Sequence, residues 1–73
     1  MESRDAELKR LGDSLRRHRV NRDFSQAEVA AELDMDIRTV QRAEAGEVNL
    51  PYTTLCKYYR LLRCPAAELF PQW

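Results

Sequence analysis

Four residues between positions 37 and 42 have side chains and spacing suited to contacts with the edges of nucleobases. On a helix, Arg38, Gln41 and Arg42 share one face, because they are separated by about one turn or by one residue. Arginine can donate two hydrogen bonds to guanine, and glutamine can pair with adenine, each in the major groove. Ile37 lies at the edge of this face and could only contact a thymine methyl group. Exposed helices also carry Arg and Gln simply because these side chains are well solvated, so this face does not decide the function by itself.

Residues that could support catalysis or metal binding are few. The chain holds one histidine, His18, and two cysteines, Cys56 and Cys64. A single histidine offers no convincing nucleophile–base pair, and we expect Cys56 in an apolar stripe where a thiol is inert. The spacing of these three residues is not that of a zinc site. We therefore predict no enzyme, no metal site and no cofactor, and we place His18 in the core or at its boundary.

The segment FSQAEVAAELDMDIRTVQRAEAG, residues 24–46, predicts the two short helices that would position the polar face. Ser25 is the expected N-cap of the first helix, and Glu28 completes a capping box. Asp34 tolerates a left-handed turn, and Asp36 can cap the next helix, which we expect to end before Gly46. The capped start of the first helix offers free backbone N–H groups that suit a phosphate. The order of short helix, tight turn and protruding helix is that of a helix-turn-helix.

Apolar spacing predicts three further helices around this pair. Leu8, Leu11, Leu15 and His18 indicate a first helix that ends at about Val20. A fourth helix begins near Pro51 and has the expected apolar stripe Tyr52, Leu55, Cys56, Tyr59 and Leu62. Pro65 opens a short fifth helix. We predict an all-α single domain over residues 1–73, a compact five-helix bundle with the helix-turn-helix at about 25–46 and C-terminal helices and tail at about 51–73.

Charge is balanced overall but unevenly distributed along the chain. The 73 residues hold 12 basic and 12 acidic side chains, which argues mildly against a nucleic-acid partner. However, residues 1–22 hold seven basic side chains, and residues 23–36 hold five acidic and no basic ones. Such segregation can give a neutral protein one positive face. No apolar run has the length of a membrane span and no signal peptide is present, so we expect a cytoplasmic protein without membrane contact.

These motifs together resemble the Cro/C1-type (XRE) helix-turn-helix family of repressors. The resemblance runs from Leu11 to Phe70 and rests on SQAEVA, the inward TV of the third helix, the E-x-G at residues 44–46, the TL at residues 54–55, and the closing ELF. Each fragment is weak alone, and all of them in register are specific. The resemblance implies a lambda-repressor-like five-helix bundle that binds operator DNA as a dimer. From the sequence itself we expect no small-molecule effector.

The resemblance also implies roles for individual residues. It places a phosphate-contacting glutamine at Gln26, and we expect Ser25 and Thr39 to contact phosphates as well. Its base-reading positions are Ile37, Arg38, Gln41 and Arg42. Its buried ion pair, which joins the first helix to the end of the third, corresponds to Arg19 and Glu44.

Departures from the family pattern occur at the joints between helices. Positions where the family often has glycine hold Asp23, Asp34 and Arg63. Aspartate tolerates the left-handed conformation, but Arg63 there would carry strain of about 1 kcal/mol. Asp36 replaces the usual Ser or Thr cap and brings a negative charge close to an expected phosphate.

The C-terminal residues Leu69, Phe70 and Trp73 are the expected dimer interface, because they end the chain with more apolar surface than a monomer should expose. The alternative is that Phe70 and Trp73 fold back onto the core of their own domain.

A second reading of the whole chain is an antitoxin-like or adaptor module that keeps this fold and binds a protein partner, such as a toxin or a polymerase. Zero net charge supports this reading, and the outward Arg38, Gln41 and Arg42 oppose it.

Overall fold

The computed structural model describes residues 4–69 of the chain, and the side chains of residues 5–67. Four helices of seven or more residues occupy this part: α1 (Arg4–Asn21), α2 (Gln26–Glu32), α3 (Ile37–Glu44) and α4 (Tyr52–Leu62). A single four-residue helical turn, α5 (Ala66–Leu69), follows. The predicted all-α class is confirmed for the described residues. The predicted bundle of five helices is reduced to four helices and one turn, because only four residues between Pro65 and Leu69 adopt helical geometry.

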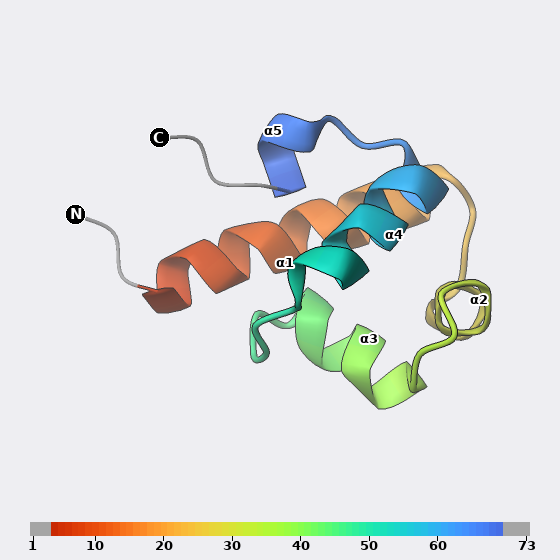
Figure 1. Cartoon of the computed structure of the whole chain (residues 1–73), viewed down its shortest axis with the longest axis horizontal. Coiled ribbons are helices and arrows are strands. Elements are labelled where there is room, and N and C mark those ends of the chain that lie inside the picture. The colour runs from red at the N-terminus through yellow and green to blue at the C-terminus, as the bar shows by residue number, and fades with distance from the viewer. Residues whose placement is uncertain (1–3, 70–73) are drawn as a thin grey trace.

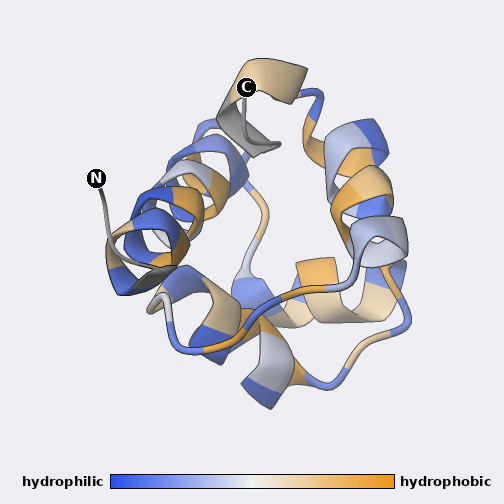
Figure 2. Ribbon diagram, turned by 60° about the vertical axis from the view of Figure 1, so that its left-hand side comes forward, coloured by the Kyte–Doolittle hydropathy of each residue, from blue (hydrophilic) through white to orange (hydrophobic). Residues whose placement is uncertain are grey.

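The two longest helices, α1 and α4, lie side by side, and α3 and α2 lie along one side of this pair, below it in Figure 1. α3 packs against both α1 and α2, while α5 packs against α1 and α4. Apolar residues are gathered on the inner faces of the helices, and polar residues colour the outer faces (Figure 2). Within residues 4–69, no helix is long and apolar enough to cross a membrane.

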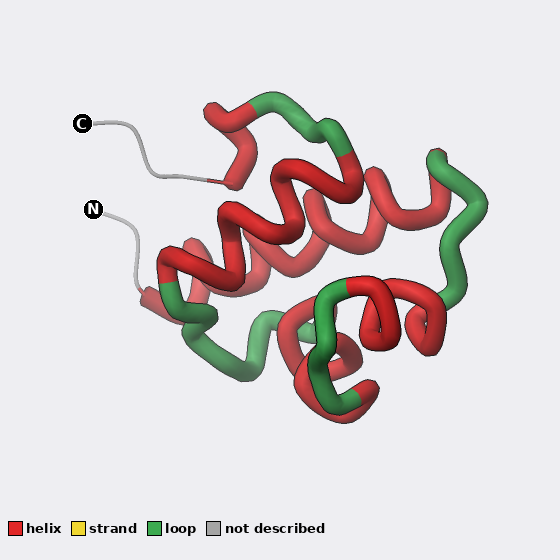
Figure 3. The backbone as a smooth tube through the Cα atoms, turned by 45° about the vertical axis from the view of Figure 1, so that its right-hand side comes forward, coloured by secondary structure: helices red, strands yellow, loops and turns green. Residues whose placement is uncertain are grey.

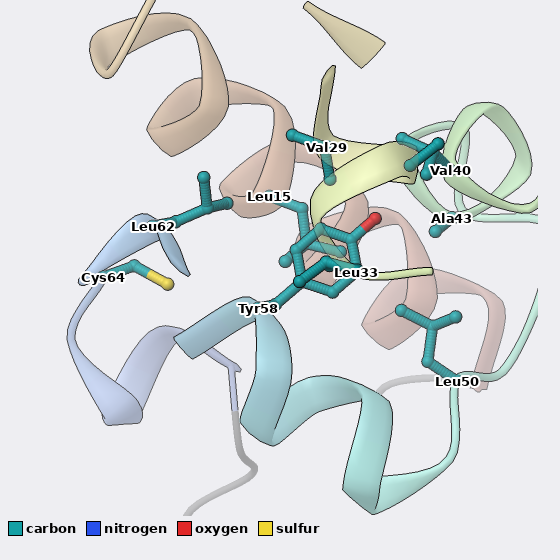
Figure 4. Close-up of a cluster of buried hydrophobic side chains, with 10 residues drawn as sticks. Leu15, Val29, Leu33, Val40, Ala43, Leu50, Tyr58, Leu62 and Cys64 are labelled. Carbon is teal, nitrogen blue, oxygen red and sulfur yellow. The ribbon is translucent and has the colours of Figure 1, made fainter. Parts of the chain in front are cut away.

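Among the described residues, the core draws one or two residues from each of helices α1 to α4 and one from each of the three loops that follow α2, α3 and α4. Leu15 of α1, Val29 of α2 and Val40 of α3 are fully buried, and Tyr58 of α4 lies among them (Figure 4). The remaining members are Ala30, Leu33, Ala43, Leu50, Leu62 and Cys64. His18 is half-buried, as predicted for a boundary residue.

The predicted apolar stripe of the fourth helix is correct at Leu62, which is buried, and at Leu55, which packs against the core, but it is wrong at its tyrosines. Tyr58 is fully buried, whereas Tyr59 is 44% exposed and Tyr52 is 69% exposed. Cys56, expected in this stripe, is half-buried, and Cys64 is the buried cysteine. Tyr58 and Tyr59 are both at helical spacing from Leu55 and Leu62, so packing against the other helices decides which tyrosine faces the core.

Each of the four joints between helices contains one residue with positive φ. Asp23 (φ 59°), Asp34 (φ 54°) and Arg63 (φ 55°) are not glycines, and Gly46 (φ 75°) is the fourth. The left-handed conformation predicted for the two aspartates and for Arg63 is therefore confirmed. Arg63 directly follows the last turn of α4 and its backbone N–H bonds the carbonyl of Tyr59 at 2.9 Å.

Burial of the Tyr58 hydroxyl predicts a stability change at high pH. Desolvation raises the pKa of Tyr58 to about 12, with a further contribution from the negative charge of Glu44. The neutral phenol is thus favoured in the folded state, while the unfolded chain titrates at about pH 10. The contribution of Tyr58 to the free energy of unfolding is fully present below about pH 10. It should fall by about 2–3 kcal/mol as the pH rises to 12. Urea unfolding of the parent and of Tyr58→Phe across this range would measure it, and equal pH profiles would contradict it.

Candidate nucleic-acid interface

The break between α2 and α3 is built from short-range hydrogen bonds that the sequence specifies. Asp34, which follows the C-cap residue Leu33 of α2, adopts the left-handed conformation, and the backbone N–H of Met35 bonds the carbonyl of Ala30 at 2.8 Å. The Asp36 carboxylate then accepts a hydrogen bond of 2.8 Å from the backbone N–H of Arg38, which caps α3. The result is a loop of only four residues between the two helices (Figure 3). The cap predicted for Asp36 is confirmed.

α2 begins with the capping box that the sequence predicts. The Ser25 hydroxyl accepts the backbone N–H of Glu28 at 3.0 Å, and the Glu28 carboxylate accepts the backbone N–H of Ser25 at 2.8 Å. The backbone bond from Ser25, followed by the bond from its hydroxyl, lowers the pKa of Glu28. The capping box thus engages both the backbone N–H and the hydroxyl of Ser25 with Glu28, and a phosphate contact by Ser25 stays a prediction.

The exposed face of α3 carries the side chains predicted to read bases. Arg38, Gln41 and Arg42 are exposed, and Ile37 is 40% exposed at the N-terminal end of the helix. On the opposite side, Val40 and Ala43 are buried. The helical projection therefore gave the correct orientation of α3. Reading of bases by these residues stays a prediction.

The inner face of α3 is fixed to α1 at a point of very close backbone approach. A Cβ atom placed on Gly12 would lie 2.6 Å from the carbonyl oxygens of both Ala43 and Glu44. One turn towards the N-terminus of α1, the backbone of Lys9 lies against Gly46, where an added Cβ would lie 2.8 Å from the Lys9 Cα. The C-terminal end of α3 thus rests directly on the backbone of α1.

Arg19 and Glu44, predicted as an ion pair, are brought together. Arg19 Nε lies 2.6 Å from Glu44 Oε2, and Arg19 Nη2 lies 3.1 Å from Glu44 Oε1. The side chains are 12% and 4% exposed. The remaining Arg19 Nη1 donates to the carbonyl of Phe24 at 2.8 Å. One guanidinium therefore connects α1, the loop before α2, and the last residue of α3.

Gln26, predicted to contact phosphate, also belongs to this network. Its Nε2 donates a hydrogen bond of 3.2 Å to Glu44 Oε1, and the residue is half-buried. Thr39, the other half-buried residue of the predicted phosphate set, lies in the first turn of α3. Asp36 is exposed, so its negative charge does lie at the N-terminal end of the candidate reading helix.

The predicted dimer residues fall largely outside the described region. Phe70 and Trp73 lie outside residues 4–69, and Leu69 is described only as the last backbone position of α5. The interface assigned to them stays a prediction.

Two residues that position the interface were missed in the sequence. Gly12 is an isolated glycine within a helical pattern, which is a signal for close approach of another backbone. Tyr58 has the same helical spacing from Leu55 and Leu62 as its neighbour Tyr59, so no sequence signal selected it. Gly12 sets how closely α3 approaches α1, and Tyr58 belongs to the same core cluster as Val40 and Ala43 of α3.

Comparison with known proteins agrees with this geometry. One family model, described as a helix-turn-helix domain, matches residues 10–70. Among solved structures, the chain is similar to the restriction-modification controller protein C.AhdI from Aeromonas hydrophila, with a TM-score of 0.81 and 29% sequence identity. The similarity covers 89% of this chain and 98% of that chain. No curated protein sequence matches the chain.

Proposed function

Because the chain belongs to the helix-turn-helix domain family, we propose that it is a DNA-binding transcriptional regulator that inserts α3 into the major groove. The observation that carries this proposal is the division of α3 into two faces. Arg38, Gln41 and Arg42 are exposed on one face, while Glu44 and Ala43 fix the other face to the domain. A rigidly held helix with long hydrogen-bonding side chains on its free face meets the requirements of direct readout.

Each exposed side chain of α3 has a specific partner in this proposal. Arg38 and Arg42 donate to guanine, Gln41 pairs with adenine, and Ile37 contacts a thymine methyl group. Gln26, Ser25 and Thr39 contact the phosphate backbone and set the orientation of α3 in the groove.

The proposal extends to a homodimer on a palindromic operator. A single short helix reads only a few base pairs, and two-fold symmetry doubles the site with half-sites about 10 bp apart. The similar structure is that of a restriction-modification controller protein. By analogy, we propose that this chain acts as a repressor that also regulates its own gene.

Replacement of Arg42 tests direct readout. Arg42→Ala should weaken binding to the preferred duplex by about 1–3 kcal/mol and leave binding to random duplex DNA nearly unchanged, because a base contact is lost. The preferred duplex would come from selection out of a random pool, and affinity would be measured by fluorescence anisotropy. Arg60→Ala, an exposed arginine on α4, is the matched control. Equal losses on both DNAs would reassign Arg42 to the phosphate backbone.

Removal of the terminal aromatic residue tests the dimer. Sedimentation of the parent at micromolar concentration should give a dimer, and Trp73→Ala should shift it towards monomer because apolar interface area is lost. Binding of the parent to a palindromic duplex should be cooperative. A monomeric parent that binds the palindrome without cooperativity would contradict the dimer.

A protein-binding module is the second candidate function, favoured by the exposed acidic residues of the α2 region. Glu28, Glu32, Asp34 and Asp36 are exposed there, and the chain carries no net charge. A salt titration of DNA affinity separates the two candidates, since phosphate contacts impose a steep dependence on salt concentration. If the protein does not bind duplex DNA even at low salt, the protein-binding module is favoured.

A further inference from the structure

The Gln26 side chain lies between a buried carboxylate and the surface proposed to meet DNA. Its Nε2 donates to Glu44 Oε1 over 3.2 Å, and this same oxygen accepts Arg19 Nη2 over 3.1 Å. Glu44 is only 4% exposed in its side chain, whereas Gln26 is half-buried. One side of the Gln26 carboxamide therefore faces the buried Glu44, and the residue remains partly accessible to solvent.

The chemistry of Glu44 fixes which atom of Gln26 faces inward. A carboxylate paired with a guanidinium accepts hydrogen bonds and has no proton to donate. The carboxamide nitrogen of Gln26, and not its oxygen, must therefore face Glu44. This nitrogen carries two N–H groups, and the bond to Glu44 uses one of them. The second N–H is then held in a defined direction before any ligand binds.

We propose that Glu44 is a positioning residue for DNA binding, which orients the Gln26 carboxamide so that its second N–H donates to a phosphate oxygen. This inference rests on the proposed function and adds to it the orientation of a phosphate-binding side chain in the free protein. Because the orientation is already fixed in the free protein, little conformational freedom of Gln26 is lost on binding. The Arg19–Glu44 pair thus has a second role beside joining α1 to α3.

The bond to Glu44 also connects phosphate contact to the pose of α3. Glu44 is the last residue of α3, and Gln26 is the first residue of α2. A phosphate bound by Gln26 is therefore linked through a single side chain to the helix proposed to read bases. Arg38 and Arg42, in contrast, are exposed and must be ordered when DNA binds.

A double-mutant cycle tests the positioning role. Gln26→Ala removes the oriented amide. The paired change of Arg19→Met and Glu44→Met removes the carboxylate that orients it and replaces a buried ion pair with apolar side chains of similar volume. Affinity would be measured for the best duplex selected by the parent protein from a random pool. We expect Gln26→Ala to weaken binding about tenfold in the parent and less than twofold in the paired variant. A tenfold loss in both backgrounds would overturn the role of Glu44.

Replacement of single phosphates distinguishes a phosphate contact by Gln26 from a purely structural role, because a structural role would not change the loss of affinity at one particular phosphate. Each phosphate of the selected duplex would be replaced in turn by an uncharged methylphosphonate. At one position the replacement should weaken binding of the parent protein but leave binding of Gln26→Ala unchanged. Gln26→Glu, which turns a carboxylate towards both Glu44 and the phosphate, should bind more weakly than Gln26→Ala. An identical phosphate map for parent and Gln26→Ala would overturn the proposal even if the paired variant does not fold.

The same experiments separate this inference from the proposed function. A parent protein that selects no duplex would contradict DNA binding itself. A parent that binds with a map independent of Gln26 would contradict only the positioning role.

Discussion

Glu44→Ala should destabilise the domain by about 3–5 kcal/mol, the largest effect expected from one substitution. Arg19 would keep its charge in a site where its side chain is 12% exposed, with two of its three hydrogen bonds removed. A domain of this size has a total stability of roughly 4–11 kcal/mol, so the variant should be partly unfolded at 37 °C. Thermal unfolding followed by circular dichroism would measure the change as a fall in Tm of about 15 °C or more.

The matched control is Glu47→Ala, which removes an exposed glutamate three residues further along the chain. It should change stability by less than about 0.5 kcal/mol. Arg19→Ala should also be costly, and the change of Arg19 and Glu44 together should cost less than the sum of the two single changes, since no charge is left unpaired. A Glu44→Ala protein that melts like the parent would show that the ion pair makes no net contribution.

Gly12→Ala should lower stability by about 1–2 kcal/mol, although alanine is the better helix former. The helix propensity of alanine favours the change by about 1 kcal/mol. A methyl group at this position would lie 2.6 Å from two backbone carbonyl oxygens of α3, which a rotamer change cannot relieve. Overpacking of this kind costs typically 1–3 kcal/mol and sometimes more, and here it displaces a helix.

The displacement distinguishes Gly12→Ala from an ordinary destabilising change. If α3 moves away from α1, specific DNA affinity should fall even at temperatures where the variant remains folded. Asp13→Ala, on the exposed side of the same helix, is the control and should melt close to the parent. A Gly12→Ala protein more stable than the parent would mean that α1 and α3 can separate at little cost.

The local structure of the candidate interface could be predicted from the sequence because the signals are short-range. The capping box of Ser25 and Glu28, the left-handed Asp34 and the Asp36 cap each depend on residues within four positions. The exposed face of α3 followed from its period. These features could be read from one segment of the chain without knowledge of the rest.

Features that depend on contacts between distant segments were less accessible. The buried tyrosine of α4 was assigned wrongly because Tyr58 and Tyr59 are equally suited to a core, and only the packing of α4 on the other helices selects Tyr58. The close approach at Gly12 depends on the crossing of α1 and α3. The link from Gln26 to Glu44 spans 18 residues, and no periodicity indicates it.

The left-handed joints have a consequence for the unfolded chain. Three of the four positive-φ positions hold Asp23, Asp34 and Arg63 in place of glycine. Each non-glycine residue restricts the unfolded ensemble and so reduces the entropy lost on folding, by about 0.5–1 kcal/mol relative to glycine. For aspartate, which tolerates this conformation, the saving offsets much of the strain, whereas Arg63 has no such tolerance. The turn between α2 and α3 therefore has less conformational freedom in the unfolded chain than glycine would give it, and the angle of α3 does not depend on a flexible glycine hinge.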